Sequence, residues 1–127
     1  MNNLILPRDP DERYYPYVHL NAETGNCEIS GESFMEGPDK FYGQVLNWFY
    51  DYIEQINKPI ILNIKLKYYN TSSSKYLLEI LRLLKTHREK NKETNVNWYC
   101  KGEDEDMVDE LEEIQKESGF KFNIVIE

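Results

Sequence analysis

Three segments of the chain alternate apolar and polar side chains with the two-residue period of a β-strand that has one face in water. The same alternation runs through residues 60–68, 95–100 and 120–126. Strands covered by helices on both faces would instead be apolar almost throughout. The pattern therefore predicts a sheet whose helices lie mainly on one face. In the first segment, the apolar face is expected to comprise Ile60, Leu62, Ile64, Leu66 and Tyr68.

Segments with a helical period separate these strands. Pro38 opens a run in which apolar residues recur every three or four positions up to Ile56, and similar runs cover residues 71–91 and 104–118. Earlier in the chain, residues 14–20 and 27–31 flank a turn and predict a β-hairpin. The order ββαβαβαβ predicts one α/β domain over residues 1–127, with a mixed sheet, an N-terminal β-hairpin and right-handed β-α-β crossovers.

The composition limits what such a domain binds. An apolar fraction of 40% over 127 residues suffices for one compact core. The net charge of −8 disfavours nucleic acid and anionic membrane as partners, so any macromolecular partner is expected to be a protein. No segment approaches the roughly 20 apolar residues of a membrane span, and the N-terminus lacks a signal-peptide pattern. We therefore expect a cytoplasmic protein without membrane insertion.

The sequence shows no pattern of a catalytic or metal site. Cys27 and Cys100 lack C-x-x-C spacing and are expected to be reduced structural thiols. The acidic run at residues 103–106 lacks the spacing of a calcium loop and is expected to begin a helix. Neither His19 nor His87 is placed for a catalytic triad, and no glycine-rich phosphate loop is present. The sequence thus predicts no enzyme activity, no metal and no cofactor.

A cluster of hydroxyl groups lies between a strand and the leucine-rich helix that follows it. It comprises Thr71, Ser72, Ser73 and Ser74, flanked by Asn70 and Lys75. One such side chain is enough to cap a helix, and further hydroxyl residues lower the helix propensity of the first turn. A phosphate ester there would meet unpaired backbone N–H groups and the positive end of the helix dipole. The excess of hydroxyls therefore favours a phosphorylation site, with Asn70 as the cap and Lys75 beside the phosphate.

Several segments in the same order along the chain resemble the SiaC family of bacterial regulatory phosphoproteins. They are ISG at residues 29–31, FYGQVLNWFYDYI, LNIKLKYYNTSSSK, VNWYC and EDEDM. The block KLKYYNTSSSKYLLEIL at residues 65–81 is the most specific of them. The resemblance implies a variant of the STAS fold, the fold of anti-sigma-factor antagonists, in which a partner kinase phosphorylates a hydroxyl at the start of a helix.

The resemblance also implies a partner switch centred on Thr71, which holds the threonine position of the family motif. A cognate serine/threonine kinase would phosphorylate Thr71, and a metal-dependent protein phosphatase would remove the phosphate. The unphosphorylated form would bind and activate a diguanylate cyclase, whose product, cyclic di-GMP, promotes aggregation and biofilm. Ser72, Ser73 and Ser74 would line the pocket or act as alternate acceptors.

Partner contacts are expected next to this cluster. Tyrosine combines apolar area with a polar tip, so Tyr68 and Tyr69, together with Ser72 and Ser73, are candidates for the contact surface. Three other interpretations remain open: a constitutive protein-binding adaptor, a module like an anti-sigma-factor antagonist with a different target, and a small hydrolase. The hydrolase would use Thr71 or Ser72 as its nucleophile and needs a general base that the sequence does not show.

Overall fold

The computed structural model describes the whole chain, residues 1–127. One six-stranded sheet has the strand order β1-β2-β3-β4-β5-β6, the same as the order along the chain. The strands are β1 Leu4–Leu6, β2 Tyr17–Leu20, β3 Asn26–Ser33, β4 Ile61–Tyr69, β5 Asn95–Cys100 and β6 Asn123–Ile126. The helices are the 3-10 helix η1 Pro10–Glu12 and the α-helices α1 Asp39–Gln55, α2 Thr71–Lys90 and α3 Glu105–Ser118.

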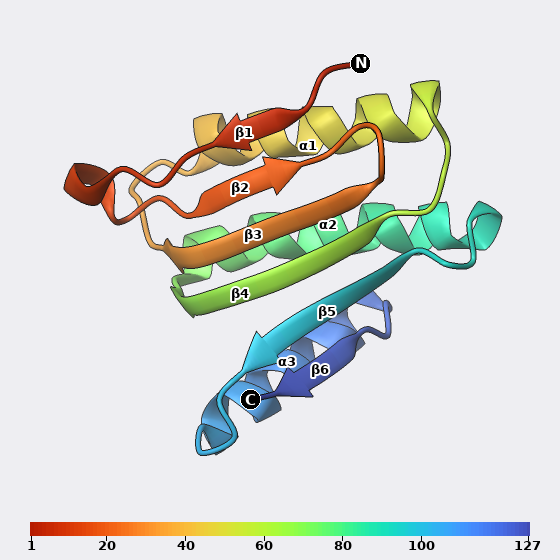
Figure 1. The fold of residues 1–127 in the computed structure, drawn as a ribbon. Coiled ribbons are helices and arrows are strands. Elements are labelled where there is room, and N and C mark those ends of the chain that lie inside the picture. The colour runs from red at the N-terminus through yellow and green to blue at the C-terminus, as the bar shows by residue number, and fades with distance from the viewer.

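The strand order explains why the helices share one face. Strands β1, β2 and β3 pair antiparallel, whereas β3, β4, β5 and β6 pair parallel through α1, α2 and α3. Each crossover moves one strand further in the same direction, and right-handed crossovers then place every helix on the same side. Figure 1 shows all three α-helices behind the sheet. The predicted α/β fold with a mixed sheet and one helical face is confirmed.

The structure adds a strand at the N-terminal end of the predicted order. β1 pairs with β2 and forms one edge of the sheet. The backbone near it is held by two further hydrogen bonds: Trp48 Nε1 donates to Asn2 O at 3.0 Å, and Ala22 N donates to Asn3 Oδ1 at 2.8 Å. A strand of three residues is too short to show a two-residue period, so only its long-range partners reveal it.

The alternation of β4 changes phase near its end, and one prediction is therefore wrong. Leu66 lies opposite Gly31 of β3, but Glu32, the next residue of β3, lies opposite Tyr68, so Lys67 is the extra residue of a β-bulge. A shift of one residue exchanges the two faces. Tyr68, expected beside Leu66 on the apolar face, is consequently 52% exposed. Tyr69 turns inward instead and packs 5.8 Å from the ring of Trp98, centroid to centroid.

The core lies between the sheet and the three α-helices. Large aromatic side chains fill much of it, and the fully buried ones include Tyr42, Phe49, Tyr52 and Trp98. Both cysteines are buried free thiols, as expected. No helix is long and apolar enough to span a bilayer. The carboxyl ends of the parallel strands β3 and β4 meet at the edge of this core where α2 begins.

Candidate functional site

Asn70 caps the helix that begins at Thr71. Its backbone is extended, with φ −89° and ψ 174°, and its side-chain Oδ1 accepts a hydrogen bond from Ser73 N at 2.9 Å. The backbone N–H of Asn70 donates to Ser33 O at 3.0 Å and so ties the turn to the end of β3. The predicted cap is confirmed. Thr71 is therefore free of the capping role that a hydroxyl at a helix start usually has.

The four consecutive hydroxyls have different surroundings. Thr71 and Ser72 are exposed, whereas Ser74 is half-buried and donates through Oγ to Thr71 O at 2.8 Å. Ser73 is 0% exposed. A kinase or another partner cannot reach Ser73 unless the start of α2 opens. The prediction that Ser73 is an alternate acceptor and a partner contact is therefore not supported by its burial.

Ser73 belongs to a buried chain of hydroxyl groups that the sequence did not indicate. Ser33 Oγ donates to Ser73 Oγ at 2.8 Å, and the Tyr42 hydroxyl lies 2.6 Å from Ser33 Oγ. Because the Ser33 proton is directed to Ser73, Tyr42 is the donor to Ser33. Burial raises the pKa of Tyr42 to about 12, so this hydroxyl keeps its proton. These hydrogen-bonded hydroxyls connect α1, β3 and the first turn of α2.

The two tyrosines before Asn70 have different roles. Tyr69 donates through its hydroxyl to Glu110 Oε2 of α3 at 3.1 Å. Burial, together with the charge and the hydrogen bond of Glu110, raises the pKa of Tyr69 well above its usual range. Tyr68 faces the opposite side, where its ring lies 5.5 Å from that of Phe34, which in turn lies 5.1 Å from that of Tyr14. Tyr68 thus belongs to an exposed aromatic cluster, and Tyr69 links β4 to α3.

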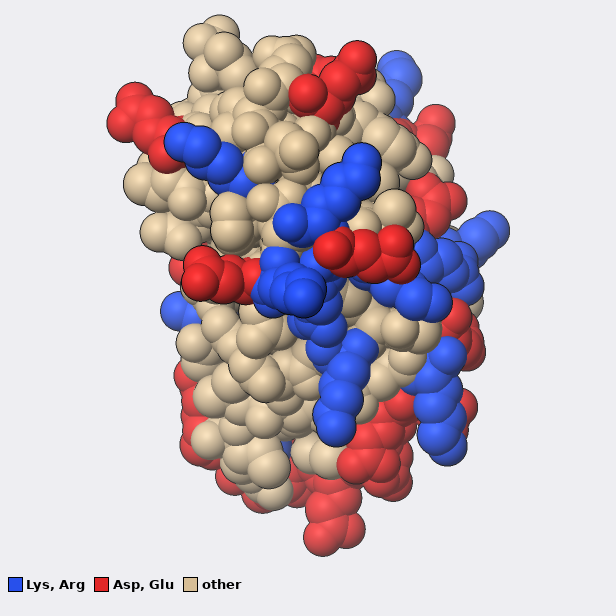
Figure 2. All heavy atoms as spheres, turned by 90° about the vertical axis from the view of Figure 1, so that its right-hand side faces the viewer, with Lys and Arg blue, Asp and Glu red and all other residues tan.

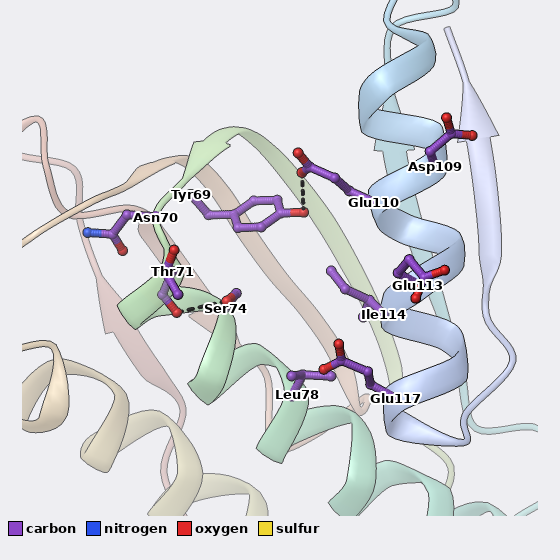
Figure 3. A pocket seen from close by; sticks show the side chains of 10 residues that line it. All are labelled: Tyr69, Asn70, Thr71, Ser74, Leu78, Asp109, Glu110, Glu113, Ile114 and Glu117. Atoms are coloured by element: carbon purple, nitrogen blue, oxygen red, sulfur yellow. Dashed lines mark hydrogen bonds between the residues drawn. The ribbon is translucent and has the colours of Figure 1, made fainter.

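A groove of about 460 Å³ separates the first turns of α2 from α3. Figure 3 shows Thr71 and Ser74 on the α2 side and the acidic side chains of α3 across from them. We call it the α2–α3 groove; its lining consists of Tyr69, Asn70, Thr71, Ser74, Leu78, Asp109, Glu110, Glu113, Ile114 and Glu117. Lys75, exposed and one turn after Thr71, lies outside this lining.

Sequence reasoning missed the acidic side of the groove. Asp109, Glu113 and Glu117 recur every fourth residue, and this spacing places them on one face of α3. The spacing was a usable signal for an acidic helix face. It could not show that these side chains line the same groove as Thr71, because only the packing of α2 beside α3 brings the two segments together.

The surroundings of Thr71 suit a phosphoryl acceptor better than a nucleophile. Neither histidine lies near it: His87 is in the last turn of α2, and His19 pairs with Glu28 towards the beginning of β3. The chain holds no group of three or more His, Cys, Asp or Glu side chains arranged for a metal ion. The first N–H groups of α2 lack helical acceptors, and the positive helix dipole favours an anion there. The site can thus accept a phosphate.

A one-sided α/β domain with an exposed hydroxyl at a capped helix start is the type of structure expected of a small regulatory protein. The comparisons with known proteins agree with this class. The chain belongs to the SiaC family of regulatory phosphoproteins, whose family model matches residues 10–127. An uncharacterized protein of Pseudomonas aeruginosa, strain UCBPP-PA14, is 26% identical over 115 residues, which make up 91% of each chain.

Solved structures of SiaC from Pseudomonas aeruginosa are similar over nearly the whole chain. The apo form of that protein matches with a TM-score of 0.84 and 24% identity, covering 100% of this chain and 99% of the other. A second structure contains SiaC in complex with the diguanylate cyclase SiaD, whose activator it is. It matches with a TM-score of 0.88 and 25% identity, over 98% of this chain and 99% of the other.

Proposed function

We propose that this protein is a phosphorylation-controlled partner switch. Its unphosphorylated form binds and activates a diguanylate cyclase, and phosphorylation of Thr71 by a cognate serine/threonine kinase ends that activation. A metal-dependent protein phosphatase restores the active form. The observation that carries the proposal is the free Thr71 hydroxyl at the capped start of α2, in a chain of the family whose Pseudomonas aeruginosa member forms a complex with a cyclase.

Exposure supports Thr71 or Ser72, rather than Ser73 or Ser74, as the acceptor. Ser73 is buried, and the Ser74 hydroxyl is half-buried and bonded to Thr71 O, so only Ser72 remains as an equally exposed alternate. A phosphate on Thr71 can accept hydrogen bonds from the first backbone N–H groups of α2. Lys75, at the i+4 position, can meet it from the same side of the helix.

Phosphorylation would change this surface through charge and size. A phosphate adds about −1.5 to −2 charge units and three acceptor oxygens. It would stand at the mouth of the α2–α3 groove, whose other side already carries the four carboxylates of Asp109, Glu110, Glu113 and Glu117. A partner fitted to the small hydroxyl would face a bulky dianion among like charges, so release is the expected result.

The aromatic cluster is the second part of the proposed contact surface. Tyr68 is 52% exposed and Tyr14 is 44% exposed, and the ring of Phe34 joins them. Exposed aromatic side chains are enriched among the residues that dominate protein interfaces. Tyr68 lies three residues before Thr71, so one partner can cover both. Tyr69 is available to a partner only from within the groove that it lines.

Two measurements test the switch. The intact mass of the protein from its own cells, followed by fragmentation, is expected to place a phosphate on Thr71. In vitro, each diguanylate cyclase of the source organism is mixed with the wild type, Thr71→Ala, Thr71→Asp or the control Thr86→Ala, and cyclic di-GMP is quantified. Thr86 is an exposed threonine in the same helix, remote from the site.

The expected outcome is activation of one cyclase by the wild type, Thr71→Ala and Thr86→Ala, and weaker activation by Thr71→Asp by about tenfold or more. Equal activation by all four proteins, with no phosphate in cells, would instead establish a constitutive adaptor. A phosphate on Thr71 without activation of any cyclase would keep the switch and reject the cyclase as its target.

A further inference from the structure

Most carboxylates across the α2–α3 groove have no ion-pair partner within the chain. No Lys or Arg lines the groove. Glu110 accepts the hydrogen bond of Tyr69, and Glu113 has only Lys116, at 3.6 Å in an ion pair whose side chains are 77% and 67% exposed. Such an exposed ion pair contributes little to stability and is screened by solvent. Arg82 of α2 donates to Glu117 O at 3.5 Å, but this contact is to the backbone, and no ion pair involves the carboxylate of Asp109, Glu110 or Glu117.

The spacing of these residues costs helix stability. Asp109, Glu113 and Glu117 stand four residues apart, and like charges at i and i+4 repel each other on a helix surface. The dipole argument does not account for all of them, because acidic side chains are favourable only in the first turn of a helix, and Glu117 lies in the last turn of α3. A cation bound in the groove would reverse this repulsion.

The floor of the groove is apolar. Leu78 and Ile114 face each other from α2 and α3, and the ring of Tyr69 closes one end (Figure 3). A long basic side chain matches such a lining, because its methylene stem packs on apolar groups while its charged end reaches the carboxylates. Arginine matches better than lysine, since its planar guanidinium can donate two parallel hydrogen bonds to one carboxylate.

We propose that the α2–α3 groove docks a basic segment of a partner protein, with an arginine stem along Leu78 and Ile114 and its guanidinium against Glu113 and Glu117. The inference rests on the proposed function only in taking a protein partner as the occupant. Docking depends on the carboxylates of α3, whereas the switch depends on the Thr71 hydroxyl. The two proposals can therefore fail separately.

The test uses the full chain, labelled with ¹⁵N, and a synthetic probe peptide, acetyl-Ala-Leu-Arg-Ala-Leu-Arg amide. A matched peptide carries citrulline, the neutral isostere, in place of each arginine. The arginine peptide is expected to shift the amide signals of groove residues, and the citrulline peptide to bind more weakly by about tenfold or more. No shifts at millimolar arginine peptide, equal shifts with both peptides, or shifts spread over the whole surface would overturn the proposal.

Paired variants separate the groove from general acidity. The double variant Glu113→Gln, Glu117→Gln removes two carboxylates of the groove, and the control Glu105→Gln, Glu112→Gln removes two from the same helix outside the groove lining. The first is expected to lose about tenfold in affinity and the control less than about twofold. Equal losses would reject the groove as the binding site. Thr86→Ala, an exposed position of α2 outside the groove lining, is expected to keep the affinity. The peptide is tested on unphosphorylated protein, so a failed phosphorylation test leaves this result intact.

Discussion

Both ends of α2 are rich in polar residues, but the fold uses the two sets differently. At the C-terminal end, the Arg88 guanidinium donates to Thr94 O at 2.9 Å, Lys121 O at 2.9 Å and Asn95 Oδ1 at 3.0 Å. It also lies 3.7 Å from the centre of the Phe120 ring. These contacts hold the start of β5 and the segment before β6 against the helix. Each of the three nitrogens of the Arg88 guanidinium thus donates a hydrogen bond within the structure.

At the N-terminal end, only part of the polar set is used in this way. Asn70 and Ser73 are bonded inside the fold, whereas Thr71, Ser72 and Lys75 are exposed. Figure 2 shows a band of Lys and Arg on the face at which α2 ends. Yet Arg88, in the last turn of α2, is committed to internal hydrogen bonds. The N-terminal end of α2 therefore differs from the C-terminal end in having exposed hydroxyl groups that make no internal hydrogen bond, and not in having more charge.

The largest expected effect comes from Arg88→Ala. It removes three hydrogen bonds from a charged donor and leaves two backbone carbonyls without a partner, so the free energy of unfolding should fall by about 3 kcal/mol. Urea denaturation of the variant measures this change. Lys90→Ala, an exposed neighbour, is the control and should cost less than about 0.5 kcal/mol. Similar losses in the two variants would contradict the structural role of Arg88.

Ser33→Ala is expected to have the next largest effect. Ser33 joins Tyr42 to Ser73, so its removal leaves two buried hydroxyls without their shared partner and should cost about 2 kcal/mol. Thermal and urea denaturation measure the loss. Ser72→Ala, which removes an exposed hydroxyl one position from Ser73, should cost less than about 0.5 kcal/mol. A neutral Ser33→Ala would show that the hydroxyl chain does not hold α2.

Removal of the Asn70 cap is expected to lower the free energy of unfolding by a smaller amount. Asn70→Ala deletes the acceptor of the Ser73 N–H and should cost about 1 kcal/mol, whereas Asn70→Asp keeps an acceptor and should retain most of the stability. Amide hydrogen exchange of the first turn of α2 is expected to accelerate in the Ala variant alone. Equal rates of amide exchange in the two variants would show that the Asn70 side chain does not cap α2.

The smallest stability effect is expected for Thr71→Ala. The cap belongs to Asn70 and the Thr71 side chain is exposed, so the free energy of unfolding should change by less than about 0.5 kcal/mol. The same variant should gain no phosphate in cell extract with ATP, under conditions in which the wild type is phosphorylated. A stability loss near that of Asn70→Ala would mean that Thr71 serves the structure after all.

Much of the fold was accessible from the chain alone. The strict alternation in residues 60–66 and 95–100 depends only on local geometry, and the structure buries Leu62, Ile64, Val96 and Trp98 accordingly. Strand β1 was missed because three residues carry no period. The orientation of Tyr68 was predicted wrongly because a bulge depends on the strand beside it, which the local pattern does not contain.

The candidate site shows the same division. Residues 70–75 were identified from their chemistry and spacing, but the acidic side of the groove comes from α3, at a sequence distance that no local pattern spans. Ser73 was grouped with its neighbours because the four hydroxyls are alike in sequence. Its burial became visible only with Ser33, which is forty positions away and donates to it.

Periodicity and capping are local properties of the chain, so the sequence was sufficient to predict the type of domain, the capped helix start and the cluster of hydroxyls. Which hydroxyl is buried and which is exposed depends on tertiary packing. Successive helical residues point about 100° apart, so packing α2 against the sheet turns Ser73 into the core and leaves Thr71 outside. The packing of α3 beside α2 then places four carboxylates in the lining of the same groove as Thr71.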